Sequence, residues 1–153
     1  MPGSRPAVLF DLDGTLCDTR SIEHLVAGDE PDYRAFHAAS AGCPADAVVA
    51  EAARRAHREG RAVVIVSSRE FIWRDLTMDW LVSQQIPYDG LYLRYSSDFR
   101  PAAVVKAELL GHVREDGFEP VEAWENHDAI LELWRESGIP EVHDARVESS
   151  QSP

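Results

Sequence analysis

Residues 62–66, Ala-Val-Val-Ile-Val, form an unbroken apolar run rich in β-branched residues, and this run constrains the fold more than any other part of the chain. A half-exposed strand alternates apolar and polar residues, whereas a strand buried on both faces is apolar throughout. Residues 7–10 form a second short run with a buried strand's composition. Strands of this kind occur mainly in parallel sheets that helices cover on both sides, so the sequence predicts an α/β fold.

Helical and strand-like patterns alternate along the rest of the chain. Residues 44–56 carry apolar side chains at helical spacing, with Pro44 at an early helical position and Gly60 beyond the end. This alternation predicts a central parallel sheet between two helical layers, with ligands bound at the carboxyl ends of the strands. In chain order, we expect strands at 7–10, 62–66, 90–94, 121–124 and 141–143, and helices at 33–39, 44–56, 70–85, 102–114 and 129–136.

The length and composition are those of one globular domain. The 153 residues are 44% hydrophobic and 27% charged, which is ordinary for a chain that buries a core. We expect a single domain over residues 7–147, between flexible ends at 1–6 and 148–153. No stretch is apolar enough to span a membrane, and residues 1–6 lack the apolar core of a signal peptide, so the expected location is the cytoplasm. Cys17 and Cys43 are then expected to be free thiols.

The net charge of −12 argues against one class of function. Proteins that coat long nucleic acids rely on many lysine and arginine contacts to phosphate, and this chain has only 15 basic residues against 27 acidic ones. Lys106 is the single lysine among the 15. The sequence also lacks the Gly-Lys-Ser/Thr of a P-loop, so no P-loop kinase is expected in this chain.

Two carboxylates directly follow the first predicted strand. Asp11 and Asp13 come after Phe10, and Gly14 then provides a residue that is free to turn. Two like charges held close together repel each other, and a divalent cation with oxygen ligands, Mg²⁺ above all, relieves the repulsion. The segment therefore predicts a Mg²⁺ site that handles phosphate; the alternative is a strand followed by an Asp-rich turn.

Two further positions have the chemistry to bind phosphate. Ser67 follows the apolar run 62–66 and precedes an expected helix, where its hydroxyl and the free backbone N–H groups favour an anion. Lys106 carries a compact positive charge that can offset a carboxylate and a phosphate together. Taken alone, a serine at this position more commonly caps the helix, and an isolated helix lysine usually lies on the surface. The carboxylates expected beside Ser67 and the order of Lys106 in the chain favour the phosphate-binding interpretation.

The segment Asp11–Thr15 resembles the first motif, Asp-x-Asp-Gly-Thr, of the haloacid dehalogenase (HAD) superfamily. The resemblance implies a three-layer, Rossmann-like fold in which Asp11 is the nucleophile that becomes an aspartyl phosphate and Asp13 is the general acid/base. It also assigns Ser67 to the second motif and Lys106 to the third, both as catalytic residues.

The fourth motif departs from the superfamily's pattern. Members commonly carry two adjacent carboxylates, whereas this chain has Glu125 followed by the amide Asn126. Asn126 keeps an oxygen ligand but lacks the charge, so we expect weaker Mg²⁺ binding, with Asp128 as the next candidate ligand. By resemblance, the metal ligands are Asp11, Asp13, Glu125 and Asn126.

Over residues 7–145 the chain is most similar to one branch of the superfamily, the 3′-phosphatase domain of phage-type polynucleotide kinase-phosphatases and their stand-alone relatives. The motifs that carry this similarity are, in order, Ser67-x-Arg69-Glu70, Arg74-x-x-Thr77-x-x-Trp80-Leu81, Leu91–Arg94, Asp98–Pro101, Val104–Lys106, Ala129–Arg135 and Gly138-Ile139. Because arginine forks bind phosphate in a bidentate way, the expected substrate-binding residues are Ser68, Arg69, Arg94 and Arg100. Alternatively, Arg94 or Arg100 pairs with Asp98.

Three functions are open at this point. The leading hypothesis is a Mg²⁺-dependent phosphomonoesterase that acts through an aspartyl phosphate on the 3′-phosphate ends of nucleotides or polynucleotides. The alternatives are a small-metabolite or nucleotide phosphatase, and a catalytically weak phosphate-binding or regulatory domain. Residues 17–43 are too few for a large cap domain, so we expect a small or absent cap and an open site. The expected partner is a phosphorylated small molecule or a nucleic-acid 3′ end, with no membrane contact and with the oligomeric state open.

Overall fold

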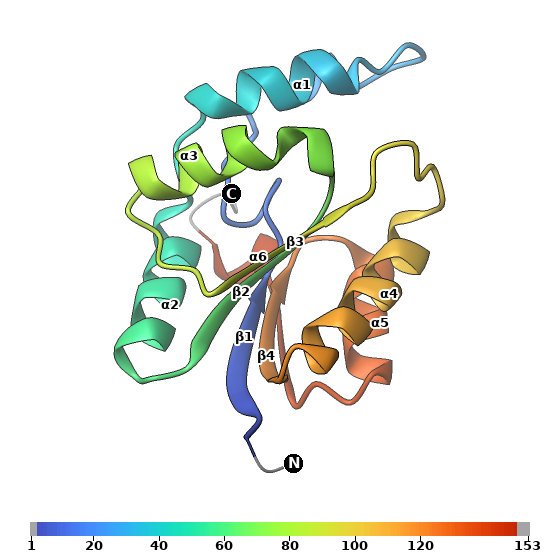
Figure 1. Cartoon of the computed structure of the whole chain (residues 1–153). Helices are drawn as coiled ribbons and strands as arrows, with labels where there is room; N and C mark the ends of the chain where they lie inside the picture. The colour runs from blue at the N-terminus through green and yellow to red at the C-terminus, as the bar shows by residue number, and fades with distance from the viewer. Residues whose placement is uncertain (1–2, 150–153) are drawn as a thin grey trace.

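The computed structural model describes residues 3–149, and these form one parallel sheet of five strands (Figure 1). The strand order across the sheet is β3-β2-β1-β4-β5, and every neighbouring pair is parallel. The strands are β1 (Arg5–Phe10), β2 (Ala62–Glu70), β3 (Gly90–Arg94), β4 (Phe118–Glu125) and β5 (Glu141–Asp144).

Helices cover both faces of the sheet, as Figure 1 shows. On one side lie α2 (Ala47–Arg58) and α3 (Arg74–Ser83). On the other side lie α4 (Ala102–Glu115) and α5 (Asp128–Glu136). A short helix, α6 (Ala145–Glu148), follows β5. The predicted three-layer α/β fold is therefore confirmed.

The central strands divide their side chains between two separate cores. In β1, Val8 and Phe10 pack into the core under α2 and α3, while Ala7 and Leu9 pack into the core under α4 and α5. β2 divides its side chains in the same alternating way. Because both faces of these strands are buried over residues 7–10 and 62–66, those segments are apolar at every position, which is the pattern from which the fold was predicted.

The helices present small or apolar faces to these cores. Asp46 begins α2 by accepting hydrogen bonds from the backbone N–H groups of Val48 and Val49, at 3.0 and 3.1 Å. The buried face of α2 is mostly alanine, which lets the helix lie close to β1 and β2. In α5 the buried residues are Ile130, Leu131 and Trp134, whose spacing forms one face of a helix.

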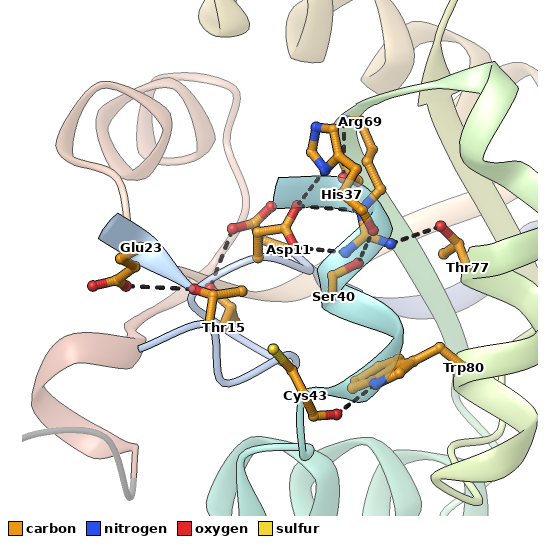
Figure 2. Close-up of polar contacts among 12 residues, drawn as sticks. Asp11, Thr15, Glu23, His37, Ser40, Cys43, Arg69, Thr77 and Trp80 are labelled. Carbon is orange, nitrogen blue, oxygen red and sulfur yellow. Dashed lines mark hydrogen bonds and ion pairs between the residues drawn. The ribbon is translucent and has the colours of Figure 1, made fainter. Parts of the chain in front are cut away.

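The segment between β1 and α2 is short, and no large cap domain is built from it. It contains η1 (Glu23–Leu25), α1 (Tyr33–Ala39) and η2 (Ser40–Gly42). In Figure 1, α1 lies beyond the carboxyl ends of the strands, beside α3. The indole N–H of Trp80 in α3 donates to the carbonyl of Cys43 at 2.8 Å, which ties this segment to the domain (Figure 2).

Several element boundaries differ from the predicted ones. β1 begins at Arg5 rather than at residue 7, and α6, which the sequence did not suggest, reaches Glu148. β2 continues to Glu70, so the helix predicted at 70–85 begins with the 3₁₀ turn η3 (Phe71–Trp73) and is α-helical only from Arg74. Of the predicted flexible ends, residues 1–2 and 150–153 lie outside the described residues. Among the described helices, none combines the length and apolarity needed to cross a bilayer.

The strand order fixes where a ligand binds. The chain runs outward from β1 to β2 and β3, and then crosses to the other side of β1 to form β4 and β5. In such sheets, the crevice for ligands opens at the carboxyl ends of the strands where the order reverses, which here are β1 and β4. Asp11 follows β1 directly, and its backbone N–H donates to the carbonyl of Trp124 in β4 at 3.0 Å.

Candidate active site

A buried lysine joins the ends of β1 and β4. Lys106, in the second turn of α4, donates from Nζ to Asp11 Oδ1 at 2.9 Å and to Glu125 Oε1 at 2.6 Å. Lys106 is only 2% exposed, and Glu125 is also buried. The second oxygen of Glu125, Oε2, accepts from the backbone N–H of Asn126 at 2.8 Å. The third and fourth predicted motifs are thus brought together with the first.

This cluster contains two carboxyl groups for one ammonium. Burial by itself lowers the pKa of Lys106, but the carboxylates of Asp11 and Glu125 outweigh burial and raise that pKa, so the ammonium is retained. Burial raises the pKa of Glu125 to about 8, with Asp11 adding to the effect and Lys106 opposing it. A single ammonium therefore faces two carboxyl groups, and a further cation would stabilise the ionised form of both.

Asp13 is held by an arginine rather than by the lysine. Arg69 Nη2 lies 2.6 Å from Asp13 Oδ1, and Arg69 Nε lies 3.2 Å from Asp13 Oδ2. Arg69 Nη1 donates to Thr77 Oγ1 at 2.9 Å, as Figure 2 shows. Arg69 is 3% exposed and is not among the residues that line the pocket described below. These contacts with Asp13 and Thr77 make Arg69 a residue that positions the Asp13 carboxylate, and its contact with substrate phosphate stays a prediction.

Gly14 lets Asn126 reach this cluster. Gly14 has φ = +80°, a left-handed conformation that disfavours any residue with a Cβ. A Cβ at Gly14 would also lie 2.2 Å from Asn126 Nδ2, far inside contact distance. Thr15 adds a hydroxyl at 3.3 Å from Asp11 Oδ2 and 3.4 Å from Asn126 Oδ1. The turn after β1 therefore depends on glycine both for its backbone and for the room that Asn126 occupies.

The oxygen atoms at the cluster fit a small divalent cation. One end of the Asn126 amide lies 2.9 Å from Asp11 Oδ2 and 3.1 Å from Glu125 Oε2. With the nitrogen at that end, the amide donates to both carboxylates. With the oxygen there, its separation from each of the two carboxylate oxygens is near the edge of a Mg²⁺ octahedron, which is about 3.0 Å for bonds of about 2.1 Å. Asp11, Glu125 and Asn126 are therefore the residues that would hold Mg²⁺; a side-chain role for Asp13 stays a prediction.

These groups form the floor of a pocket of about 800 Å³ at the carboxyl ends of the strands. Among residues 3–149, the lining includes more acidic than basic side chains, with Lys106 and Arg94 as its lysine and arginine. An anionic phosphate would be repelled by this surface without a bound cation, which is a second reason why the site fits a metal. The lining carboxyl groups are those of Asp11, Asp13, Glu23, Glu70, Asp98 and Glu125.

The remaining predicted site residues fall into two groups. Ser67, Ser68 and Arg94 line the pocket with Asp11 and Lys106. Arg94 Nε donates to the carbonyl of Ser68 at 2.7 Å. Arg100 and Asp128 do not line the pocket.

These two side chains lie outside it because other groups hold them. Arg100 is exposed and bonds to the carboxylates of Asp98 and Glu108, so the alternative reading, a pairing with Asp98, is the correct one for this arginine. Asp128 bonds to Arg146 at the start of α5 and does not compensate for the missing charge of Asn126.

Sequence reasoning missed several residues that line or support the pocket. Tyr33, Phe36 and His37 come from α1, and Phe99 comes from the segment between β3 and α4. His37 Nδ1 is buried, has no hydrogen bond within the described part of the chain, and lies 3.9 Å from Asp13 Oδ2 (Figure 2). Burial lowers the pKa of His37 to about 4, so its ring is neutral at neutral pH. Of these residues, only Phe99 lies in a motif that carried the similarity to polynucleotide 3′-phosphatases, the segment Asp98–Pro101.

Solved structures with the same fold include phosphatases. Pnkp1 in two structures of the Pnkp1/Rnl/Hen1 complex, one described as an RNA repair complex, aligns with TM-scores of 0.77 and 0.78, at 24% and 26% identity. The alignments cover 94% and 92% of this chain but 43% and 45% of those chains, so this chain spans less than half their length. A class C acid phosphatase from Bacillus anthracis aligns with a TM-score of 0.64 at 16% identity, over 80% of this chain and 52% of the other.

A HAD-like hydrolase from Streptococcus pneumoniae also aligns with a TM-score of 0.64, at 15% identity, over 92% of this chain and 84% of the other. No curated protein sequence matches this chain. The family described as "Polynucleotide kinase PNKP phosphatase domain" matches residues 5–146, from β1 to the start of α6. The chain therefore belongs to the PNKP phosphatase-domain family of the HAD superfamily.

Proposed function

We propose that this protein is a phosphomonoesterase that removes the 3′-phosphate from polynucleotide ends through an aspartyl phosphate on Asp11. The observation that carries the proposal is the cluster of Asp11, Lys106, Glu125 and Asn126 at the carboxyl ends of β1 and β4. A carboxylate nucleophile needs its charge balanced when a phosphate dianion approaches it, and this cluster provides both an ammonium and a set of oxygens for a cation.

In the first step, an oxygen of Asp11 attacks the phosphorus and the bond from phosphorus to the 3′ oxygen breaks. Asp13 gives its proton to the leaving 3′ oxygen, which becomes a hydroxyl. In the second step, Asp13 takes a proton from water, and the resulting hydroxide attacks the phosphorus of the aspartyl phosphate. Inorganic phosphate leaves, and the carboxylate of Asp11 is restored. Arg69 holds the Asp13 carboxylate in place for both proton transfers.

The phosphoryl oxygens need donors that are fixed before the reaction. Lys106 Nζ is already bonded to Asp11 and therefore stands where negative charge accumulates. The hydroxyl of Ser67 lines the same floor, and its oxygen accepts from the backbone N–H of Arg69 at 3.1 Å, which leaves its own hydrogen for a phosphate oxygen. When bound, Mg²⁺ would supply charge neutralisation between Asp11 and the phosphate.

The choice of a polynucleotide end rests on the family and on the shape of the site. The relatives with the same fold include Pnkp1 of an RNA repair complex, so RNA 3′ ends are the first substrates to test and RNA-end repair proteins are the partners to test. The short segment between β1 and α2 leaves the pocket open to a chain end. The net charge of −12 is compatible with binding one terminal nucleotide, because such binding does not require a long basic track.

The experiment compares phosphate release from matched substrates in the presence of Mg²⁺. These are one oligonucleotide with a 3′-phosphate, the same oligonucleotide with a 5′-phosphate, a nucleoside 3′-monophosphate and a sugar phosphate. We expect the 3′-phosphorylated oligonucleotide to have the highest kcat/KM. Preference for a mononucleotide or a sugar phosphate would instead support a metabolite phosphatase. Turnover of none of them would support a binding domain, for which the amide at Asn126 was the motive.

A further inference from the structure

Phe99 is a large apolar side chain that is exposed to solvent and also lines the pocket. Phe99 is 84% exposed, yet it lines the same pocket as Asp11 and Lys106. A well-exposed aromatic ring on a soluble domain is unremarkable by itself, but one that lines a catalytic pocket indicates contact with a ligand. Tyr95, in the same segment between β3 and α4, is 74% exposed but does not line the pocket, and so provides a natural control.

Hydrogen bonds on both sides of Phe99 fix its position. Arg94 Nη1 donates to the carbonyl of Asp98 at 2.8 Å and to the carbonyl of Arg100 at 3.0 Å, so one guanidinium holds the residues before and after the ring. The side chain of Asp98 in turn accepts from the backbone N–H and the guanidinium of Arg100. Ser97 has φ = +72°, a costly conformation that persists only where the surrounding contacts require it. The ring is therefore presented on a preorganised turn.

The pocket is larger than a phosphate group requires. Its volume of about 800 Å³ lies within the range of whole small-molecule sites, about 300–1,000 Å³. The charged cluster lines one part of the pocket, and residues of α1 line another part. These include Tyr33, which is 60% exposed. Figure 1 shows the β3–α4 segment and the start of α1 on the same side of the molecule. A ligand with a phosphate at one end and a flat apolar group at the other matches this division.

We propose that Phe99 is a stacking platform for the terminal base of the substrate, so that the pocket recognises a complete nucleotide rather than a bare phosphate ester. The inference rests on the proposed function, because it assigns the base of the same 3′-phosphorylated end. An aromatic ring stacks on any base through its π-face, which gives affinity for nucleotides without sequence specificity. Phe99 is a binding residue in this account and takes no part in the proton or phosphoryl transfers.

The test combines one change in the protein with one change in the substrate. Phe99→Ala, Phe99→Tyr and the control Tyr95→Ala are each assayed on two 3′-phosphorylated oligonucleotides in Mg²⁺. One carries a normal purine at its 3′ end; the other carries an abasic sugar at that position. We expect Phe99→Ala to raise KM for the purine end by about 5- to 150-fold, the range for losing one base–aromatic stack, with kcat little changed. Phe99→Tyr keeps the ring and should stay near wild type.

The abasic end separates stacking from damage to the site. If Phe99 stacks on the base, then Phe99→Ala leaves KM for the abasic end unchanged, wild type prefers the purine end, and Tyr95→Ala changes neither. If Phe99→Ala instead matches Tyr95→Ala on the purine end, or weakens both ends equally, the stacking role is wrong while the proposed phosphatase function stands. If wild type releases phosphate from neither end, the proposed function itself has failed, and the base subsite fails with it.

Discussion

Replacing Lys106 with methionine tests the charge balance of the cluster in the absence of any substrate. Methionine keeps an unbranched side chain but removes the ammonium that bonds Asp11 and Glu125. Breaking a buried ion pair by removing one partner costs about 3–5 kcal/mol, because the remaining charge is left without compensation. For a domain of this size, that loss corresponds to a fall in Tm of about 6–20 °C.

The pH dependence identifies the cause of this loss. Burial already raises the pKa of Glu125 to about 8 in the wild type, and removing Lys106, which opposes this effect, raises that pKa further. A carboxyl group with a raised folded-state pKa makes a protein less stable as the pH rises towards that pKa. Wild type stops losing stability by this route above about pH 8, whereas Lys106→Met continues to lose it, so the deficit should be larger at about pH 9 than at about pH 6. Urea unfolding with a chelator present measures the unfolding free energy of wild type and variant at each of the two pH values.

A matched control removes a charge that has no such role. Arg58 forms an exposed ion pair with Glu51 on α2, so Arg58→Met should change stability little and without this pH dependence. A loss for Lys106→Met below about 1 kcal/mol at about pH 9, or a loss that is the same at about pH 6 and about pH 9, would refute the argument that the ammonium compensates buried carboxylates.

Three further changes test the turn, the metal ligand and the outer edge of the sheet. Gly14→Ala and its control Gly60→Ala both place alanine at positive φ, and each should lower the free energy of unfolding by about 1–2 kcal/mol in a urea titration. Only Gly14→Ala also displaces Asn126, so only this variant should lose phosphatase activity in a phosphate-release assay. Asn126→Asp should lower the Tm of the metal-free protein and increase the rise in Tm on adding Mg²⁺, because it adds a third carboxylate to the cluster. Burial lowers the pKa of His143, but Glu148 and other carboxylates more than offset burial, so the net effect is a raised pKa. The charged imidazole therefore stabilises the fold at low pH. Wild type should have a higher unfolding free energy than His143→Gln at about pH 6 and should lose this advantage by about pH 9.

The sequence predicted the fold because the central strands are buried on both faces. Residues 62–66 have to be apolar throughout, and that run is visible without any knowledge of the partners. The extension of β2 to Glu70 was not visible, because the pairing of Glu70 with Arg94 in β3 is a tertiary contact. The short helix α6 likewise has only four residues, too few for a periodic pattern.

The floor of the site was predictable for a related reason. Asp11 directly follows β1 and Glu125 ends β4, and parallel strands bring their carboxyl ends to one edge of the sheet. Ser67 was expected to end its strand before a helix, but it lies within β2, which continues to Glu70. The partners of the arginine side chains were not predictable from the sequence, because a long side chain can reach several carboxylates. Arg69 turns inward to Asp13, whereas Arg100 stays outside with Asp98, and only the folded structure distinguishes them.

We propose that Asp11 is the nucleophile of a Mg²⁺-dependent phosphatase acting on 3′ ends. The most direct measurement is phosphate release from one 3′-phosphorylated oligonucleotide by wild type and by Asp11→Asn, each with Mg²⁺ and with a chelator. Asparagine is nearly isosteric with aspartate but cannot form the acyl phosphate, so we expect turnover only for wild type with Mg²⁺. Substantial turnover by a folded Asp11→Asn protein would contradict the account.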